Sequence, residues 1–165
     1  LFANFRSFVE GILTGDILRL RRKNKFMEML FREELLQSAT YETHAYPSGM
    51  YSDNQKFAIA DRLLRKYASA RLLITSRIHC ALPGLAVGTP VIFINGFDSF
   101  VDSCRFDGIM DLLNRIDINR KGGIAFNYDS PKMIDIDTIV TNSSKHVRLA
   151  NDLRNTCVAF CSEGD

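Results

Sequence analysis

Two short stretches in the middle of the chain are apolar at every position, and a helix-like segment separates them. Residues 72–74 and 91–94 contain only leucine, isoleucine, valine and phenylalanine. Such runs are typical of central parallel strands, because both faces of such a strand are covered. The intervening residues 79–87 have a helical pattern, which Gly88 and Pro90 end. The sequence therefore predicts a β-α-β unit whose two strands are parallel and joined by a right-handed crossover.

The segment before this unit is predicted to be a helix. Ser52 and Gln55 have the spacing of a capping box, in which each side chain bonds the backbone amide of the other residue. Apolar residues then recur at intervals of three and four positions, which predicts that one face of the helix is buried. The residues of this expected face are Phe57, Ala60, Leu64 and Tyr67.

The other segments complete an α/β pattern. We expect helices over residues 24–37, 108–114 and 143–161, an extended segment over 39–46 and a strand over 124–128. Residues 130–131 are expected to begin a further helix. The predicted fold is a Rossmann-like parallel sheet with flanking helices. Residues 1–38 are expected to be a helical lead-in, and residues 39–165 the Rossmann-like domain.

Composition suits one soluble domain and narrows the function classes. The 165 residues are 46% hydrophobic and 24% charged, with a net charge of +2. This near-neutral balance gives no electrostatic support for nucleic-acid binding, and no apolar run is long enough to span a membrane. We expect a cytoplasmic protein, either free or at the inner face of the membrane. The four cysteines and three histidines have no zinc-binding spacing, so we expect reduced thiols and no metal or cofactor.

The turn after the first apolar strand carries the clearest candidate chemistry. Ligands of open parallel sheets bind beyond the carboxyl ends of strands. Here the segment Thr75-Ser76-Arg77-Ile78-His79 follows such an end. Because proline is tolerated only in the first turn of a helix, Pro83 predicts a helix that begins close to Cys80 or is kinked. Free amides at that start would favour an anion, the Arg77 guanidinium suits phosphate or carboxylate, and His79 can exchange a proton near neutral pH.

Each of these residues also has an ordinary structural explanation. Arg77 could belong to a surface pair that caps neighbouring loops, and His79 could be a hydrogen-bonded core histidine. His44 ends an extended segment, so it could reach the same strand mouth or be a simple loop residue. Arg105 lies in the loop after the second strand, where it could bind a ligand or be a surface charge.

The run from Tyr67 to Ile94 resembles the polysaccharide pyruvyltransferase family. In that family a helix ending in the pattern kYa.A enters a strand and turn of the pattern lviTsRlHcalp, and GtPvifi follows. The corresponding segments here are YASA, LLITSRIHCALP and GTPVIFI. The resemblance extends upstream to Thr43-His44 and downstream to residues 105–109, which are similar to the family's Rf.gl.

The resemblance implies a fold and a reaction. Members of this family are similar to two-domain GT-B glycosyltransferases, whose active site lies between two Rossmann-like halves, and this chain resembles the C-terminal, donor-binding half. Because residues 1–38 are too short to be the other half, the resemblance implies an N-terminal domain in the full-length protein. The implied reaction transfers a pyruvyl group from phosphoenolpyruvate to hydroxyls of a saccharide acceptor and forms a ketal, as in exopolysaccharide biosynthesis.

The resemblance also implies roles for residues of the turn. His79 would be the general acid that protonates C3 of phosphoenolpyruvate as a sugar oxygen adds to C2, or else a phosphate ligand. Arg77 would bind the phosphate or the carboxylate, and Ile78 would contribute a backbone group. The expected substrate-binding residues are Ser76, Arg77, Ile78, His44 and Arg105.

Two alternatives stay open. A glycosyltransferase of the same architecture would use a nucleotide sugar, although the sequence has no GxGxxG motif and no acidic residue clearly placed for a ribose. A non-catalytic binding domain would use the same fold only as a scaffold, because a fold does not by itself establish a function.

Overall fold

The computed structural model describes residues 25–42, 47, 49–96, 106, 108–119 and 121–162. Its contacts divide the chain into two compact units, residues 1–57 with 129–139 and residues 58–128 with 140–165. We name them the first unit and the sheet unit. The division falls inside helix α4 (Asp53–Ser69), and each unit is described by itself.

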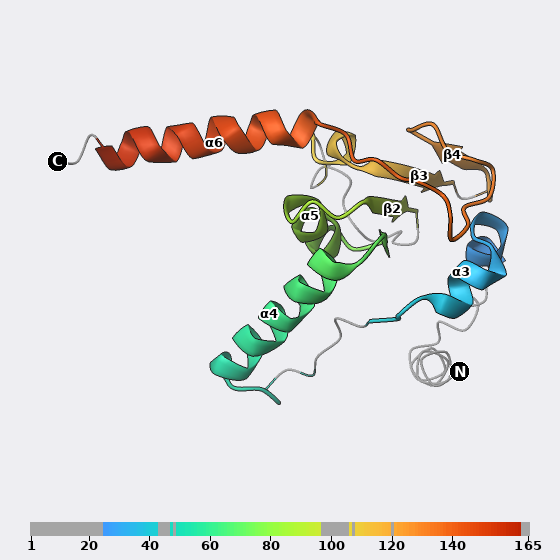
Figure 1. Ribbon diagram of the computed structural model, residues 1–165, viewed down its shortest axis with the longest axis horizontal. Coiled ribbons are helices and arrows are strands. Elements are labelled where there is room, and N and C mark those ends of the chain that lie inside the picture. Colours follow the sequence, from blue (N-terminus) through green and yellow to red (C-terminus); the bar gives the residue numbers. More distant parts are fainter. Residues whose placement is uncertain are drawn as a thin grey trace. The chain divides into compact units, whose positions relative to one another are not determined.

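The sheet unit is built on a four-stranded sheet with the order β1-β2-β3-β4 (Figure 1). Its strands are β1 (Leu73–Thr75), β2 (Val91–Asn95), β3 (Asn114–Ile118) and β4 (Ile124–Phe126). The first three are parallel, and β4 is antiparallel to β3. Helix α5 (Ile78–Ala86) connects β1 to β2. The α/β fold and the parallel β-α-β unit predicted from the sequence are therefore confirmed.

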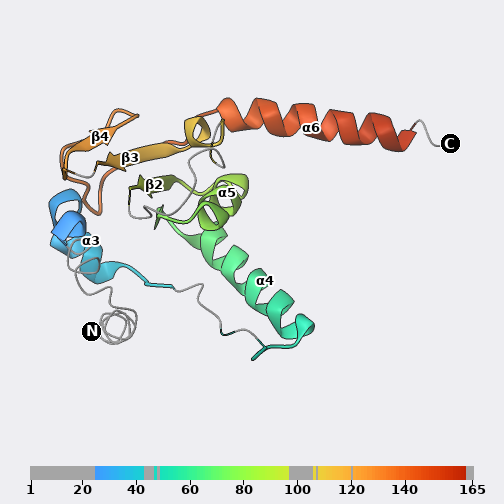
Figure 2. The ribbon, with the colours of Figure 1, turned by 180° about the vertical axis from the view of Figure 1, so that it is seen from behind.

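Strand β2 is the most deeply buried element of the sheet. Its residues 91–94 are all buried, as expected for a strand covered on both faces. Val91 and Phe93 form a core cluster with residues of α5, which lies beside β1 and β2 (Figure 2). Gly84 permits this close packing, because a Cβ there would lie 2.5 Å from Leu73 Cδ2 and 3.2 Å from Val91 Cγ2.

Helix α4 begins as the sequence predicts but buries a different face. The capping box is confirmed, since Ser52 N donates to Gln55 Oε1 at 2.8 Å and Gln55 N donates to Ser52 Oγ at 3.4 Å. The expected apolar face is confirmed only at Tyr67, which is buried. Phe57 is 75% exposed and Leu64 is 42% exposed, and Leu63 is buried in their place. Residues 59, 63 and 67 form the packed stripe. Apolar residues occur on more than one side of this helix, so periodicity alone does not choose the buried one.

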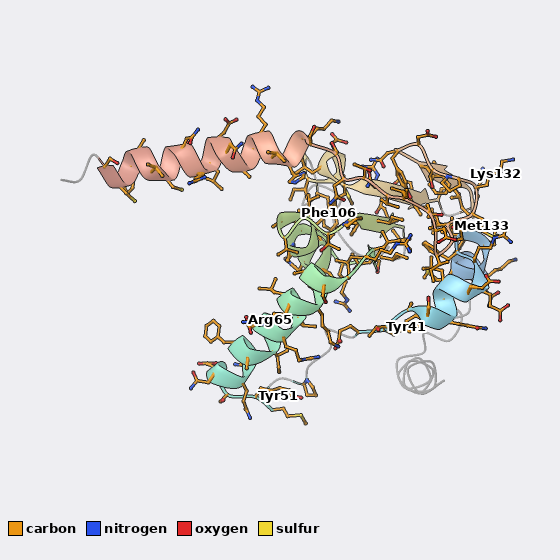
Figure 3. The ribbon with its side chains drawn as sticks, in the orientation of Figure 1. Tyr41, Tyr51, Arg65, Phe106, Lys132 and Met133 are labelled. Carbon is orange, nitrogen blue, oxygen red and sulfur yellow. The ribbon has the colours of Figure 1, made fainter. Side chains whose placement is uncertain are left out.

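The solvent side of α4 carries ordinary surface pairs. Arg65, which Figure 3 labels on this helix, donates from Nε to Asp61 Oδ2 at 2.8 Å. The hydrogen bond to Asp61 and its charge raise the pKa of Arg65. Both side chains are well exposed, so such a pair adds little to stability.

The helix expected over residues 108–114 is wrong, and the strand that follows, β3, is not predicted by the sequence. The structure has a short 3-10 helix, η2 (Met110–Leu112), and then a strand. Along β3 the residues alternate: Asn114, Ile116 and Ile118 are buried, and Arg115 and Asp117 are half-buried. The strand thus has one apolar and one charged face, a pattern that differs from the uniform apolar runs of β1 and β2. The predicted strand at residues 124–128 is confirmed as β4.

Helix α6 (Lys145–Ser162) is confirmed, and none of its described residues is buried. The segment before it is tied to the amino end of β2 by asparagine side chains. Asn142 Oδ1 accepts from Val91 N at 2.9 Å, and Asn142 Nδ2 donates to the Thr89 carbonyl at 2.7 Å. Asn114 Nδ2 donates to the Thr141 carbonyl at 3.1 Å. None of the described helices is long and apolar enough to cross a membrane.

The first unit interrupts the helix that was expected over residues 24–37. Residues 25–30 and α3 (Glu33–Ser38) are helical, but Phe31 forms a parallel bridge with Ile134. Arg32 N donates to the Ile134 carbonyl at 2.8 Å, which requires extended backbone and breaks the helix. No helix begins at residues 130–131, contrary to the prediction, because that segment leads into this bridge.

Candidate functional site at the carboxyl edge of the sheet

The turn between β1 and α5 is very short. Only Ser76 and Arg77 separate the end of the strand at Thr75 from the first helical residue, Ile78. The Arg77 backbone amide donates to Thr75 Oγ1 at 3.0 Å, a local bond that fixes the turn. Arg77 is the N-cap residue and has extended backbone angles, φ −111° and ψ 122°. The turn is therefore held by its own backbone and by one threonine hydroxyl.

Helix α5 begins earlier than the proline predicted. It starts at Ile78 rather than near Cys80, and Pro83 lies inside it. The Arg77 carbonyl accepts from the amides of Cys80 and Ala81, both at 3.0 Å, so the first turn is fully formed. The amides of Ile78 and His79 have no acceptor in the described part of the chain, as expected for the first positions of a helix. The helix continues beyond Pro83, with Val87 N donating to the Pro83 carbonyl at 3.1 Å.

Both charged candidates of the turn point to solvent. The side chains of Arg77 and His79 are exposed, and neither forms a hydrogen bond or ion pair with any described residue. His79 is thus not a core histidine. Its neighbour Cys80 is buried with Leu63 and Tyr67, and Ile78 packs against the core below α5. One face of the first helical turn is therefore fixed by apolar packing, and the other carries side chains that have no partner among the described residues.

A second polar group is formed by side chains of β2 and β3, and we call it the β2–β3 cluster. It consists of Asn95, Arg115 and Asp117. Asn95 Nδ2 donates to Asp117 Oδ1 at 2.7 Å, and Arg115 Nε donates to Asp117 Oδ2 at 2.8 Å. Because no strand is expected at residues 114–118, the sequence does not predict this cluster. The alternation of Arg115-Ile116-Asp117-Ile118 is the signal that could have revealed it.

The strand register relates the cluster to the turn. Thr75 pairs with Phe93, and Asn95 pairs with Asp117. Side chains two residues apart share a face, so Asn95 and Asp117 lie on the same face as Phe93, which packs against α5. Thr75, Phe93 and Arg115 are level with one another across the three strands. Because neighbouring strands lie about 4.8 Å apart, about 10 Å separates the backbones of Thr75 and Arg115. The free start of α5 and the cluster therefore share one edge and one face of the sheet.

Gly96, the residue after Asn95, has a backbone conformation that glycine adopts readily. Its φ is +114°, and a Cβ at this position would collide with the Ile118 carbonyl at the end of β3. Such a conformation is open to glycine and strained for other residues. The backbone of Gly96 therefore lies directly against β3, immediately after the side chain of Asn95.

The remaining candidates are His44, Arg105 and the cysteines. His44 and Arg105 lie outside the described residues, so their expected roles stay predictions. Within the described part of the chain, no three side chains of histidine, cysteine, aspartate or glutamate are grouped as a metal site would require. Cys80 is buried, and Cys157 and Cys161 are exposed on α6, all three as free thiols.

Comparison with known proteins found no match, whether to a protein-family model, to a characterised protein or to a solved structure. The family resemblance therefore stays a prediction from the sequence motifs.

Proposed function

We propose that the protein transfers the pyruvyl group of phosphoenolpyruvate to hydroxyls of a cell-surface polysaccharide. One observation carries the proposal: Arg77 and His79 are exposed beside two amides that lack an acceptor in the described part of the chain. We also propose that the sheet unit is the Rossmann-like, donor-binding half of a GT-B-type enzyme. The full-length protein would then also have an N-terminal domain.

The start of α5 suits a small phosphorylated anion. Helix α5 has nine residues, and its amino end offers the Ile78 and His79 amides with the positive end of the helix dipole. Arg77 adds a planar fork of donors that matches phosphate or carboxylate. Ser76, which is half-buried in the same turn, supplies a hydroxyl. Phosphoenolpyruvate carries both a phosphate and a carboxylate, so this set of donors suits it as the pyruvyl donor.

His79 suits the proton transfer that the reaction needs. In the first step a sugar hydroxyl oxygen bonds to C2 of phosphoenolpyruvate while C3 receives a proton. In the second step another hydroxyl oxygen of the same sugar displaces phosphate from C2, which closes the ketal and releases inorganic phosphate. Each hydroxyl gives up its proton, so the reaction needs no oxidant, reductant or cofactor. An exposed imidazole at the donor site is a suitable general acid for C3.

A second candidate function is sugar transfer from a nucleotide sugar, and Asp117 is the observation in its favour. A carboxylate near the carboxyl end of a parallel strand is where many nucleotide-binding sheets hold ribose hydroxyls. The turn at Arg77 would then bind a diphosphate. A binding domain without catalytic activity would use the same donors for an anion but would not turn it over.

The test is calorimetric titration of phosphoenolpyruvate into the protein and two arginine variants. We expect Arg77→Ala to bind about tenfold more weakly or worse, because a charge-assisted pair is lost. The matched control is Arg71→Ala, which removes an exposed arginine before the amino end of β1 and should bind as the wild type does. A folded wild type that does not bind phosphoenolpyruvate would overturn the proposal, and uridine diphosphate would then be titrated for the second candidate.

A further inference from the structure

The β2–β3 cluster has no role in binding the anion, yet it lies on the same edge and face of the sheet as the donor turn. We propose that Asn95, Arg115 and Asp117 form a hydroxyl-binding subsite that takes a vicinal diol of a sugar. The identification of that sugar as the pyruvyl acceptor rests on the proposed function. The subsite itself rests on the chemistry of the cluster.

The cluster keeps donors and acceptors that its internal bonds do not use. An ionised carboxylate has about four lone-pair positions, and Asp117 uses one on each oxygen for Asn95 and Arg115. Arg115 Nη1 is 3.9 Å from Asp111 Oδ1, which is too long for a hydrogen bond. Asn95 Oδ1 has no donor among the described residues. The cluster can therefore both accept and donate further bonds.

The mixture of charges selects the kind of ligand. A phosphate would be repelled by Asp117, and a metal ion would be repelled by Arg115. A hydroxyl group avoids both penalties, because it can donate to the carboxylate and accept from the guanidinium at the same time. Two adjacent hydroxyls match the spacing of the acceptors on one carboxylate. A sugar diol is therefore the ligand that uses the whole cluster.

The cluster is both reachable and pre-organised. The side chains of Arg115 and Asp117 are 22% and 35% exposed, so a ligand can contact them. Their positions are nevertheless fixed by paired strands and by the two bonds to Asp117. Groups held in place before binding lose little conformational freedom when the ligand arrives. These features distinguish the cluster from the mobile ion pairs of an exposed helix surface.

Two sources could supply the diol, and both would place a sugar next to the turn. One is the saccharide acceptor, whose hydroxyls would then lie near C2 of a donor bound at Arg77 and His79. The other is the ribose of a nucleotide sugar, whose diphosphate would extend to the same turn. The backbones of Thr75, which precedes the turn, and of Arg115 in the cluster are about 10 Å apart, a distance that one sugar with its substituent can bridge.

The test uses saturation-transfer NMR with two probes, a mixture of methyl hexopyranosides and uridine diphosphate. We expect binding of a hexoside or of uridine diphosphate by the wild type, and an affinity about tenfold lower in Asp117→Asn. Asp111→Asn is the matched control, because it removes an exposed carboxylate near Arg115 but leaves the cluster bonds intact. Binding of the hexoside identifies the acceptor, and binding of uridine diphosphate alone identifies the ribose.

Two outcomes would overturn the subsite: a folded wild type that binds neither probe, or an Asp117→Asn variant that binds as tightly as the wild type. If Asp117→Asn does not fold, as judged by thermal unfolding, Asn95→Ala takes its place, since it removes a single hydrogen bond at the strand end. Titration of phosphoenolpyruvate separates the two proposals. Donor binding without sugar binding removes the subsite alone, and sugar binding without donor binding removes the proposed function alone.

Discussion

The two polar groups at the carboxyl edge are held in place in opposite ways. At the turn, the backbone is fixed by the Thr75 hydroxyl and by the packing of Ile78 and Cys80, while Arg77 and His79 project without partners in the described part of the chain. In the β2–β3 cluster, by contrast, the side chains hold one another, and paired strands hold their backbones.

This difference indicates which ligand each group suits. Unpaired cationic groups and free amides lose little when they exchange water for an anion, and they gain a strong charge-assisted interaction. A carboxylate that is already paired is nearly neutral as a unit, so it discriminates by hydrogen-bond geometry rather than by charge. The turn is therefore suited to bind a charged donor, and the cluster to orient a neutral polyol. Variants of His79, Gly96 and Thr75 test this difference between the turn and the cluster.

The largest effect should come from His79, the proposed general acid. We expect His79→Gln to lower the rate of phosphate release from phosphoenolpyruvate by about 10²–10⁴-fold, because the general acid for C3 is lost. Affinity for phosphoenolpyruvate should fall far less, since the amides and Arg77 remain. The rate and the affinity are measured by steady-state kinetics.

A second histidine provides the control for this prediction. His146 lies at the start of α6, where its Nδ1 is 2.6 Å from the Ser143 carbonyl. His146→Gln should keep the wild-type rate. A near-normal rate in His79→Gln at saturating phosphoenolpyruvate would show that His79 is not the acid, and such a rate together with a large loss of donor affinity would make it a phosphate ligand.

The next effect concerns the backbone beside the cluster. We expect Gly96→Ala to lower the free energy of unfolding by about 3 kcal/mol or more, since positive φ costs about 1–3 kcal/mol and the added Cβ also meets the Ile118 carbonyl. That carbonyl cannot move away freely, because Ile118 is paired with Ile124 of β4. Urea unfolding followed by circular dichroism measures the loss.

Gly88 is the matched glycine for this comparison. Its φ is +84°, but an added Cβ would have no atom within 4 Å. Gly88→Ala should therefore lose only about 1–2 kcal/mol, the cost of the backbone conformation alone. Equal losses in the two variants would mean that the close approach of Gly96 to β3 does not matter for stability.

The sequence predicted most reliably what depends on nearby residues. The capping box at Ser52 and Gln55 formed as expected, because both partners lie within one turn. The β-α-β unit was also predicted, since uniformly apolar runs signal strands. Strand β2 is buried as expected for a central strand, whereas β1 lies at the edge of the sheet and is half-buried. The candidate turn followed from these elements, as Arg77 and His79 come directly after a predicted strand.

What depends on distant residues was missed. The break at Phe31 requires pairing with Ile134, about which the local pattern carries no information. The buried side of α4 is decided by contacts of Leu63 and Tyr67 with α5 rather than by the apolar period. For the β2–β3 cluster, the alternation of residues 115–118 indicates the strand, but the register that brings Asn95 to Asp117 joins residues far apart in the chain.

The smallest effect should come from the hydroxyl that fixes the turn. Thr75→Val removes the acceptor for the Arg77 amide but keeps the size and β-branching of the side chain. The loss of one such bond corresponds to about 0.5–1.5 kcal/mol, so we expect affinity for phosphoenolpyruvate to fall about two- to tenfold. Thr75→Ser keeps the acceptor and should recover most of the affinity, measured by calorimetry. If valine and serine variants bind equally well, the turn is held by the packing of Ile78 and Cys80 alone, and the contrast with the side-chain-bonded cluster becomes sharper.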